Sequence, residues 1–436
     1  MLNFLTDRRY RDCEGIDRRD FLRIGALGAG ALTLPQLLAA RAAAKAAGKP
    51  VKETSVVWVW LAGGPTQMET FDPHMRAPVE YRSTTGEVKT RLPGVTIGGT
   101  FPKLARVSDK LAIVRSFAHN NSGHVGGTHF VNTGYDNRNI DNGGAPARPS
   151  IGSIVARVRG SNHSQTGMPT YVALTRIRAG IDGPAFLGTP YSPFDPNGQA
   201  LKNLSLAVSE KRVDNRRMLL ASLDRLNSDI DRSGAMEGMD RFEQQAFNLV
   251  LGGAPAAFDI KKENTKTVAR YGKGIGEQLL RARRLCETGC GFVTLSYNGW
   301  DMHNDIKNRM NKLGPPLDQA LAAFIQDVHA RGLQDRILLV VTGEFGRTPK
   351  VNKNGGRDHW APLSTLALSG GGLKTGQVVG ESMPKGDLPR TPPIGPQDLM
   401  ATVFHVLGIP RETQFMSNAG RPVYMIEEGE PIAELV

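Results

Sequence analysis

The sequence predicts an α/β protein whose mostly parallel central sheet is flanked by helices. Two segments, 56–61 and 337–341, are continuous apolar runs, as expected for strands buried on both faces of a parallel sheet. The 436 residues, of which 40% are hydrophobic, suffice for one large α/β domain with insertions or for two domains. Polar segments follow several predicted strands. Because open α/β sheets place ligands at the carboxyl ends of their strands, we expect the candidate site residues to converge at that edge.

The formal net charge of +12 does not by itself indicate a nucleic-acid partner. The chain has no basic helix with interleaved aromatic residues and no known nucleic-acid-binding motif. An anionic substrate, small or polymeric, explains the charge equally well, as does simple solubility. We therefore expect an anionic partner and no nucleic acid.

Residues 1–48 have the pattern of a twin-arginine export signal and are not expected to join the fold. The pair Arg18-Arg19 is followed by a polar residue and then by Phe-Leu. The segment 24–38 is only mildly apolar, too weak and too short for a permanent membrane span. We therefore expect the twin-arginine machinery to export the protein, to the periplasm or beyond, with a mature domain over 49–436. Because that route moves folded proteins, it allows a cofactor to be loaded in the cytoplasm.

The first predicted strand, 56–61, runs into a Gly-Gly loop that carries two acidic residues, Glu69 and Asp72. Each carboxylate is a candidate oxygen ligand for a metal at the sheet edge. A solvated turn capped by Asp72 before Pro73 explains the same residues without a site.

A short strand predicted over 111–114 opens onto three of the chain's nine histidines, His119, His124 and His129. Neutral imidazole is a good ligand for zinc and similar metals. Ser122 is predicted to cap a helix, where its hydroxyl would face the positive end of the helix dipole and an anionic substrate. Ser122 is therefore a candidate nucleophile, and a plain capping role is the alternative.

The middle of the chain is predicted to be largely helical. We expect a short helix over 149–160, a strand over 170–175 and a Gly- and Pro-rich loop over 176–200. Apolar residues at helical spacing then predict an inserted helical subdomain at about 203–288.

Two cysteines, Cys286 and Cys290, straddle a predicted helix end and strand start. Two cysteines alone make a weak case for zinc. A short-loop disulfide is an option in an oxidising compartment, and two small semi-buried residues is the simpler interpretation.

The strand predicted over 292–297 ends in a loop that carries Asp301 and His303. These residues fit one metal only from an irregular loop, because in a regular strand they would share a face at larger separation. The strand over 337–341 delivers Glu344 to its carboxyl end, and Arg347 and the Asp358-His359 pair follow it.

Regular elements account for most of the remaining C-terminal part. We expect helices over 317–331 and 396–407, a strand over 364–369 and a short strand over 423–426.

The candidate residues combine nitrogen and oxygen ligands with a hydroxyl and arginines. For a divalent zinc, calcium or manganese ion, the predicted ligands are Glu69, Asp301, His303, Glu344, Asp358 and His359. The predicted catalytic residues are Ser122, His124 and Arg347, and the predicted substrate-binding residues are His119, His129 and Arg357. A metal polarises a sulfate or phosphate ester and activates its nucleophile, and arginine binds the oxyanion with two hydrogen bonds. Binding of an anion without turnover is the alternative for the same set.

Several motifs together resemble a large bacterial family. Beside the twin-arginine leader, they are GGPTQMETFDP, HNNSGHVGGTHFVNTGY, ARRLCETGCGFVTLSYNGWDMHND, VVTGEFGRTP and GRDHW. The chain resembles the domain-of-unknown-function 1501 family, common in planctomycete-like bacteria, over essentially the whole mature chain. That family looks like a distant branch of the alkaline phosphatase and sulfatase superfamily. The resemblance implies a mostly parallel sheet between helices and a metal site at the strand ends.

The superfamily resemblance also implies roles for individual residues. In chain order they are an acidic ligand at Glu69 or Asp72, a nucleophile near Ser122, a ligand pair at Asp301 and His303, a later acidic residue at Glu344 and a last histidine at His359.

The chain departs from the superfamily pattern in three places. The first strand ends in Gly63-Gly64 and not in Asp, and Glu344-Phe345 replaces the later Asp-His. No Cys-x-Pro-x-Arg sequence is present, so a formylglycine sulfatase is not expected. We expect an exported metal-dependent hydrolase of sulfate or phosphate esters, with polysaccharides among its candidate substrates. The alternative is a catalytically inactive relative that binds anionic glycans or another envelope component.

Overall fold

A computed structural model of the chain describes residues 53–177, 180–197 and 254–436. The predicted export signal, 1–48, and most of the predicted helical insertion, about 203–288, lie outside the described residues. None of the helices in the described ranges combines the length and the apolarity that a bilayer span requires.

A seven-stranded sheet forms the centre of the described chain. In spatial order its strands are β11 (Gln377–Val379), β4 (Ala112–Val114), β10 (Leu366–Gly370), β7 (Ile337–Thr342), β1 (Ser55–Ala62), β6 (Phe292–Asn298) and β5 (Tyr171–Ala173). β10 runs antiparallel to its neighbours β4 and β7, and the other neighbouring pairs are parallel. The predicted mostly parallel sheet is therefore confirmed.

β1 lies between β6 and β7 and pairs with both of them in parallel. Successive side chains of a strand point to opposite faces. In β1 both sets are buried, with Val57 and Val59 on one face and Trp58 and Trp60 on the other. Burial on both faces explains why β1 and β7 are continuous apolar runs and not alternating ones.

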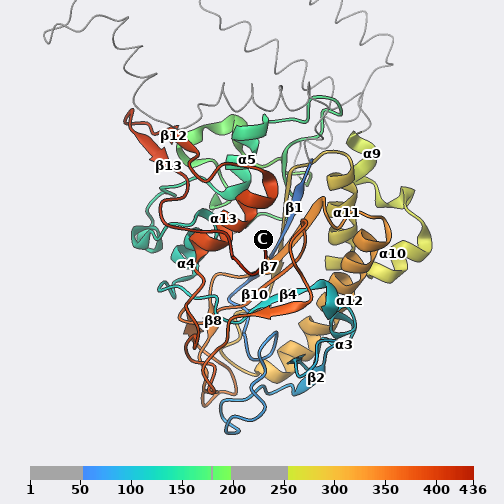
Figure 1. The fold of residues 1–436 in the computed structure, drawn as a ribbon, viewed down its shortest axis with the longest axis vertical. Coiled ribbons are helices and arrows are strands. Elements are labelled where there is room, and N and C mark those ends of the chain that lie inside the picture. Colours follow the sequence, from blue (N-terminus) through green and yellow to red (C-terminus); the bar gives the residue numbers. More distant parts are fainter. Residues whose placement is uncertain (1–52, 178–179, 198–253) are drawn as a thin grey trace, which may run out of the picture. The chain divides into compact units, whose positions relative to one another are not determined.

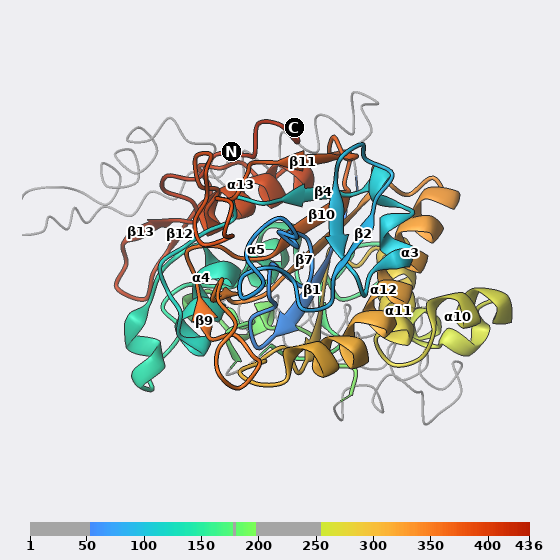
Figure 2. The same cartoon turned by 90° about the horizontal axis from the view of Figure 1, so that it is seen from below.

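Helices cover both faces of the sheet (Figure 1). α11 (Ile275–Glu287) packs against α12 (Ile306–Ala330), β1 and β6, whereas α13 (Pro396–Leu407) packs against α4 (His124–Thr133) and β1. Both views place the layer of α11 and α12 on one side of the strands and α13 and α4 on the other (Figures 1 and 2). The sheet flanked by helices thus agrees with the prediction.

The remaining described elements are short. The helices are α3 (Pro102–Ala105), α5 (Ile151–Arg159), α9 (Ala254–Phe258) and α10 (Thr265–Tyr271). The 3₁₀ helices are η1 (Ser108–Lys110), η2 (Arg138–Asn142), η4 (Ala185–Leu187), η5 (Thr189–Tyr191) and η6 (Ile260–Lys262). Three antiparallel strand pairs are β2 (Glu87–Lys89) with β3 (Thr96–Gly98), β8 (Gly346–Arg347) with β9 (His359–Trp360), and β12 (Gln414–Met416) with β13 (Pro422–Tyr424).

Most predicted elements are present, and one helix is longer than predicted. α12 begins at Ile306 and continues through Pro315 and Pro316, whereas the prediction began after these prolines. Proline lacks an N–H and clashes with the preceding turn, so a proline pair is typical of a helix start. Here the buried side chains of Ile306 and Met310 extend the apolar face of α12 across the pair. Tertiary packing of this apolar face therefore outweighs the preference of the proline pair for a helix start.

Cys286 and Cys290 are free and buried. Burial raises the pKa of the Cys290 thiol to about 12 and that of Cys286 well above its usual value. Both are therefore neutral thiols at neutral pH.

A buried arginine links the helices on one side of the sheet. The side chain of Arg283 in α11 is 1% exposed and forms ion pairs with Glu263, Glu287 and Asp327. Asp327 in α12 also accepts a hydrogen bond from the hydroxyl of Tyr271 in α10 at 2.9 Å. Because buried charges are costly unless they are paired, these contacts tie α10, α11 and α12 together.

Replacing Arg283 with methionine is expected to lower the free energy of unfolding by about 1.5–3 kcal/mol, because three carboxylates lose one charged hydrogen-bond donor. Arg270, Arg284 and Arg331 still pair with them. Urea unfolding followed by circular dichroism measures the change. Arg91→Met is the control, since the pair of Arg91 with Asp109 is exposed and its loss is expected to cost about 1 kcal/mol or less. Equal losses of unfolding free energy in the two variants would contradict the role of Arg283 as the buried link between these helices.

The same network predicts a pH dependence. Burial alone would raise the pKa of Glu263, but the hydrogen bond and charge of Arg283 outweigh it and lower the pKa from 4.5 to about 2. A lowered folded-state pKa contributes stability that is present above pH 4.5 and is lost as the pH falls toward 2. Between pH 4.5 and pH 2, the free energy of unfolding of the wild type is therefore expected to fall by more than that of Arg283→Met.

Candidate metal centre

Polar side chains from separate parts of the chain meet beyond the carboxyl ends of β1, β6 and β7. The loop after β6 carries Asp301, the loop after β7 carries Glu344, and α4 begins at His124. The pairing of β8 with β9 sets Arg347 opposite His359. Figure 2 shows β9 beside α4, and the rings of His124 and His359 lie 4.4 Å apart. These residues therefore converge at the edge of the sheet that the sequence predicted.

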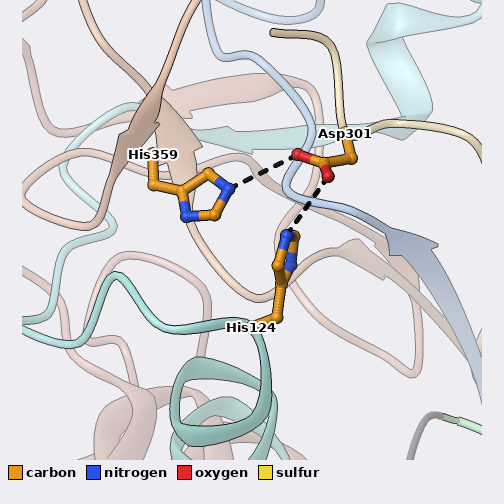
Figure 3. A group of neighbouring side chains, drawn as sticks. All are labelled: His124, Asp301 and His359. Carbon is orange, nitrogen blue, oxygen red and sulfur yellow. Dashed lines mark hydrogen bonds and ion pairs between the residues drawn. The ribbon is translucent and has the colours of Figure 1, made fainter.

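His124, Asp301 and His359 form the centre of the site (Figure 3). Nε2 of His124 lies 3.4 Å from Oδ2 of Asp301, and Nε2 of His359 lies 3.4 Å from Oδ1 of Asp301. One ligand atom from each of the three residues lies within 4.8 Å of the other two. Tetrahedral ligands at metal distances of about 2.0–2.1 Å are about 3.3 Å apart. Both distances to Asp301 match this spacing, and the three residues are called the metal cluster below.

Arg347 keeps Asp301 charged. A terminal nitrogen of its fully buried guanidinium donates to Oδ1 of Asp301 at 2.6 Å. Burial alone would raise the pKa of Asp301, but Arg347, with smaller contributions from His124 and His303, outweighs it and lowers the pKa to about 2. Asp301 is therefore ionised at neutral pH, as a metal ligand must be.

Arg347 also holds the loop after β1. Its Nε donates to the carbonyl of Gly64 at 2.9 Å, and its terminal nitrogens donate to the carbonyls of Gly63 and Arg357. The guanidinium is 0% exposed. The predicted contact with a substrate oxyanion needs access to solvent, so this environment fits a positioning role better.

Glu344 contacts His124 on the side opposite to Asp301. Its Oε1 lies 2.8 Å from Nδ1 of His124 and accepts the backbone N–H of Gly63, also at 2.8 Å. The residue is 3% exposed. Glu344, predicted as a metal ligand, therefore touches the cluster through the ring of His124.

His303 and Asp358 extend the metal cluster toward solvent. Nε2 of His303 lies 3.0 Å from Oδ1 of Asp301 and 3.0 Å from Nε2 of His359. Its Nδ1 lies 2.7 Å from Oδ1 of Asp358, and this hydrogen bond is the main cause that lowers the pKa of Asp358. The carboxylate thus orients the imidazole, whose Nε2 can serve as a ligand or hold a proton.

Glu69 and Arg357 pair with each other and do not join the metal cluster. Both side chains are fully buried, and Oε1 of Glu69 lies 3.1 Å from a terminal nitrogen of Arg357. Glu69 also accepts hydrogen bonds from Thr66 and Thr84, and Arg357 donates to the carbonyls of residues 81–82. Because these partners satisfy both charges, the pair links the loop after β1 to the segment before β9. The predicted ligand and substrate-binding roles have no support in this geometry.

Ser122 lies beside His359, but it does not cap α4. The N-cap is Gly123, and the helix begins at His124, so the capping prediction is wrong. The carbonyl of Ser122 lies 3.0 Å from Nδ1 of His359, and its hydroxyl accepts the N–H of Ala361 at 3.1 Å. Ser122 is exposed, and its nucleophilic role stays a prediction.

The other two histidines of this segment lie outside the metal cluster. His119 packs against the rings of Phe117 and Phe130, and burial lowers its pKa to about 4. His129 is fully buried with Nδ1 at 2.8 Å from the carbonyl of Tyr135, and burial lowers its pKa as well. A neutral imidazole offers no positive charge for the predicted contact with an anionic substrate.

Asp72, the second acidic residue after β1, is also held elsewhere. Its carboxylate contacts Nε2 of His74 at 2.8 Å, Nε of Arg115 at 3.2 Å and the hydroxyl of Ser382. Serine, histidine and aspartate are the residue types of a hydrolytic triad. Here, however, the same ring nitrogen of His74 contacts both other residues, so it cannot relay a proton between them. These residues link two loops.

Two glycines that no sequence prediction assigned to the site belong to it through their backbones. Gly63 and Gly64 have φ angles of +118° and +80°. A Cβ on Gly63 would lie 2.3 Å from the nitrogen of Asp301, and one on Gly64 would lie 2.4 Å from the ring of Phe345. The Gly-Gly pair was visible in the sequence. Its close neighbours come from distant segments, so the local pattern did not reveal why glycine is required.

The fold and the site define an α/β protein with a candidate metal centre at the carboxyl edge of its sheet. Residues 53–436 match the family described as protein of unknown function (DUF1501), and the chain belongs to that family. A comparison with curated proteins gave no match.

Several solved structures resemble the fold. The PsFucS1 sulfatase from Pseudoalteromonas sp. has 11% identity and a TM-score of 0.39, over 85% of this chain and 70% of that one. The alkaline phosphatase from the Antarctic bacterium TAB5 has 12% identity and a TM-score of 0.37, over 82% and 98%. The phosphonate monoester hydrolase SpPMH from Silicibacter pomeroyi has 12% identity and a TM-score of 0.34, over 82% and 74%.

Gly63→Ala is expected to weaken the binding of Zn²⁺ by about 10-fold or more, because the added methyl group displaces Asp301. Contacts that hold a metal ligand in place affect metal affinity by about this much. Competition with a chromophoric chelator measures the Kd. Gly86→Ala is the matched control, since Gly86 also has a positive φ and nothing lies within 4 Å of its added Cβ. Equal Kd values for the two variants would refute the role of Gly63.

Proposed function

We propose that this protein is an exported metal-dependent hydrolase of sulfate or phosphate esters. The observation that carries the proposal is the convergence of His124, Asp301 and His359, whose ligand atoms lie within 4.8 Å of one another. The side chain of Asp301 is 44% exposed, so a substrate can approach the metal cluster from solvent.

The donor set favours zinc or a similar transition metal over calcium. Two imidazoles and one carboxylate supply two nitrogens and an oxygen, and imidazole suits zinc, copper, iron and nickel. Calcium instead takes six to eight oxygen ligands. Three protein ligands with an open position are also the pattern of catalytic zinc sites.

The chain's own residues support ester hydrolysis in distinct ways. A bound metal polarises the ester oxygen and lowers the pKa of water. His124, Asp301 and His359 would hold it, and Arg347 keeps Asp301 ionised. His303, oriented by Asp358, presents Nε2 to hold or move the proton of the leaving alcohol.

The substrate class follows from charge and exposure. A formal net charge of +12 favours an anionic substrate, and an exposed site accepts a polymer as readily as a small ester. We therefore propose sulfate or phosphate esters, including those on polysaccharides. Ser122 beside His359 remains the protein's candidate nucleophile.

The wild type, purified without chelators, is expected to hold about one transition-metal ion per chain, and His359→Ala should hold much less because it lacks one of three ligands. Elemental analysis measures the content. His405→Ala is the control, because His405 is exposed on α13. The wild type and the control should hydrolyse members of a panel of aryl sulfates and phosphate mono- and diesters. The activity of His359→Ala on the same esters should be lower by at least about 100-fold. A metal-free wild type would refute the metal assignment.

A second candidate is an inactive relative that binds anionic glycans or another envelope component. The burial of Arg347 supports this second candidate, because a buried guanidinium is not available to stabilise a reacting oxyanion. Stoichiometric metal with no turnover over the whole panel would select this candidate.

Export by the twin-arginine route is part of the proposal and rests on the sequence of residues 1–48. Replacing Arg18 and Arg19 together with lysine is expected to leave the protein in the cytoplasm, because the paired arginines are the recognised feature. Cell fractionation of a twin-arginine-competent host measures the distribution. Arg8 and Arg9, an arginine pair that also lies within residues 1–48, serve as the control, and an equal effect of both double substitutions would argue against the export signal at Arg18-Arg19.

A further inference from the structure

We propose that Glu344 is a positioning residue for His124 and not a metal ligand. The inference rests on the proposed metal-dependent function and concerns the same site. It assigns Glu344 the task of fixing which ring nitrogen of His124 carries the hydrogen and which one faces Asp301 and His359.

The contacts of Oε1 support this assignment. Oε1 accepts the backbone N–H of Gly63 at 2.8 Å and lies 2.8 Å from Nδ1 of His124. A carboxylate oxygen in this position accepts, so Nδ1 is the nitrogen that carries the hydrogen. Nε2 then has its lone pair free, and it is Nε2 that lies 3.4 Å from Oδ2 of Asp301.

The position of Glu344 excludes it from the centre of the site. Glu344 is not one of the three residues of the metal cluster, whose ligand atoms lie within 4.8 Å of one another. Glu344 meets His124 through Nδ1, the nitrogen that does not face Asp301. It is buried, whereas the side chain of Asp301 is 44% exposed. In metal sites, a histidine that binds the metal through one ring nitrogen commonly donates the hydrogen of its other ring nitrogen to a carboxylate.

The second carboxylate oxygen of Glu344 does not add to the stability of the fold. Oε2 is buried and has no hydrogen-bond partner among the described residues. A buried polar atom without a partner costs free energy.

The next residue, Phe345, packs its ring 5.1 Å from that of His124 and 4.4 Å from that of His359. The loop after β7 therefore holds His124 by a hydrogen bond and by ring packing together.

Glu344→Gln tests the inference, because a glutamine amide can either accept from Nδ1 or donate to it and so no longer specifies the tautomer. The Kd for Zn²⁺, measured by chelator competition, is expected to rise about 10- to 100-fold with one ion still bound at saturation. Glu344→Asp, shorter by one methylene, should show a smaller rise. Asp72→Asn is the matched control, since Asp72 is a buried carboxylate bound to a histidine outside the cluster. Its Kd should equal that of the wild type.

Two spectroscopic measurements separate positioning from ligation and from a purely structural role. With Co²⁺ in place of Zn²⁺, the visible bands of Glu344→Gln should keep their intensity, because the number of ligands is unchanged; a marked change would identify Glu344 as a ligand and overturn the inference. In the metal-free protein, ¹⁵N NMR of His124, assigned with His124→Gln, should show hydrogen on Nδ1 in the wild type and a mixture of tautomers in Glu344→Gln.

The outcomes distinguish this inference from the proposed function. A wild type that binds Zn²⁺ while Glu344→Gln binds it equally tightly overturns the role of Glu344 and leaves the proposed function standing. A wild type that binds no metal overturns the proposed function. In that case the NMR experiment still decides the tautomer, and hydrogen on Nε2 of His124 in the wild type would overturn the inference as well.

Discussion

The buried guanidinium of Arg347 is the contact on which the site depends most. It joins the carbonyls of Gly63 and Gly64 after β1, the carboxylate of Asp301 after β6 and the carbonyl of Arg357 before β9. A buried cation needs a partner of opposite charge and acceptors for its remaining hydrogens. Asp301 supplies the charge, and the strand-end loops supply the acceptors. The same contacts that satisfy Arg347 therefore place Asp301 between His124 and His359.

The fold was predictable where burial leaves a local pattern in the sequence. β1 and β7 are buried on both faces, and each is a continuous apolar run. The bounds of α13 agree with the prediction, because a proline at its first position and a glycine after its last residue mark both ends. The start of α12 was not predictable, because packing overrides the proline pair inside it. The antiparallel direction of β10 has no local signal, since direction is set by pairing with β4 and β7.

The location of the site at the sheet edge was predictable, and Asp301 and His359 were predicted as metal ligands, whereas His124 was predicted as a catalytic residue and not as a ligand. His124, Asp301 and His359 each follow a strand end in the sequence, and the sheet brings those ends together. The chemical type of a residue does not show whether it binds a ligand or another residue of the protein. Glu69 and Arg357 are separated by 288 positions and neutralise each other, and Glu344 and His124 are separated by 220. Only the fold reveals such pairs, so their roles could not be read from local sequence.

The most direct test of the central claim is the position of a bound metal. Crystals of the protein grown with Zn²⁺, with diffraction data collected on both sides of the zinc absorption edge, would locate the ion by its anomalous signal. The proposed site predicts one strong peak between Nε2 of His124, the carboxylate of Asp301 and Nε2 of His359. Crystals with no anomalous peak there, or with zinc bound only at other residues, would contradict the metal centre and the function proposed from it.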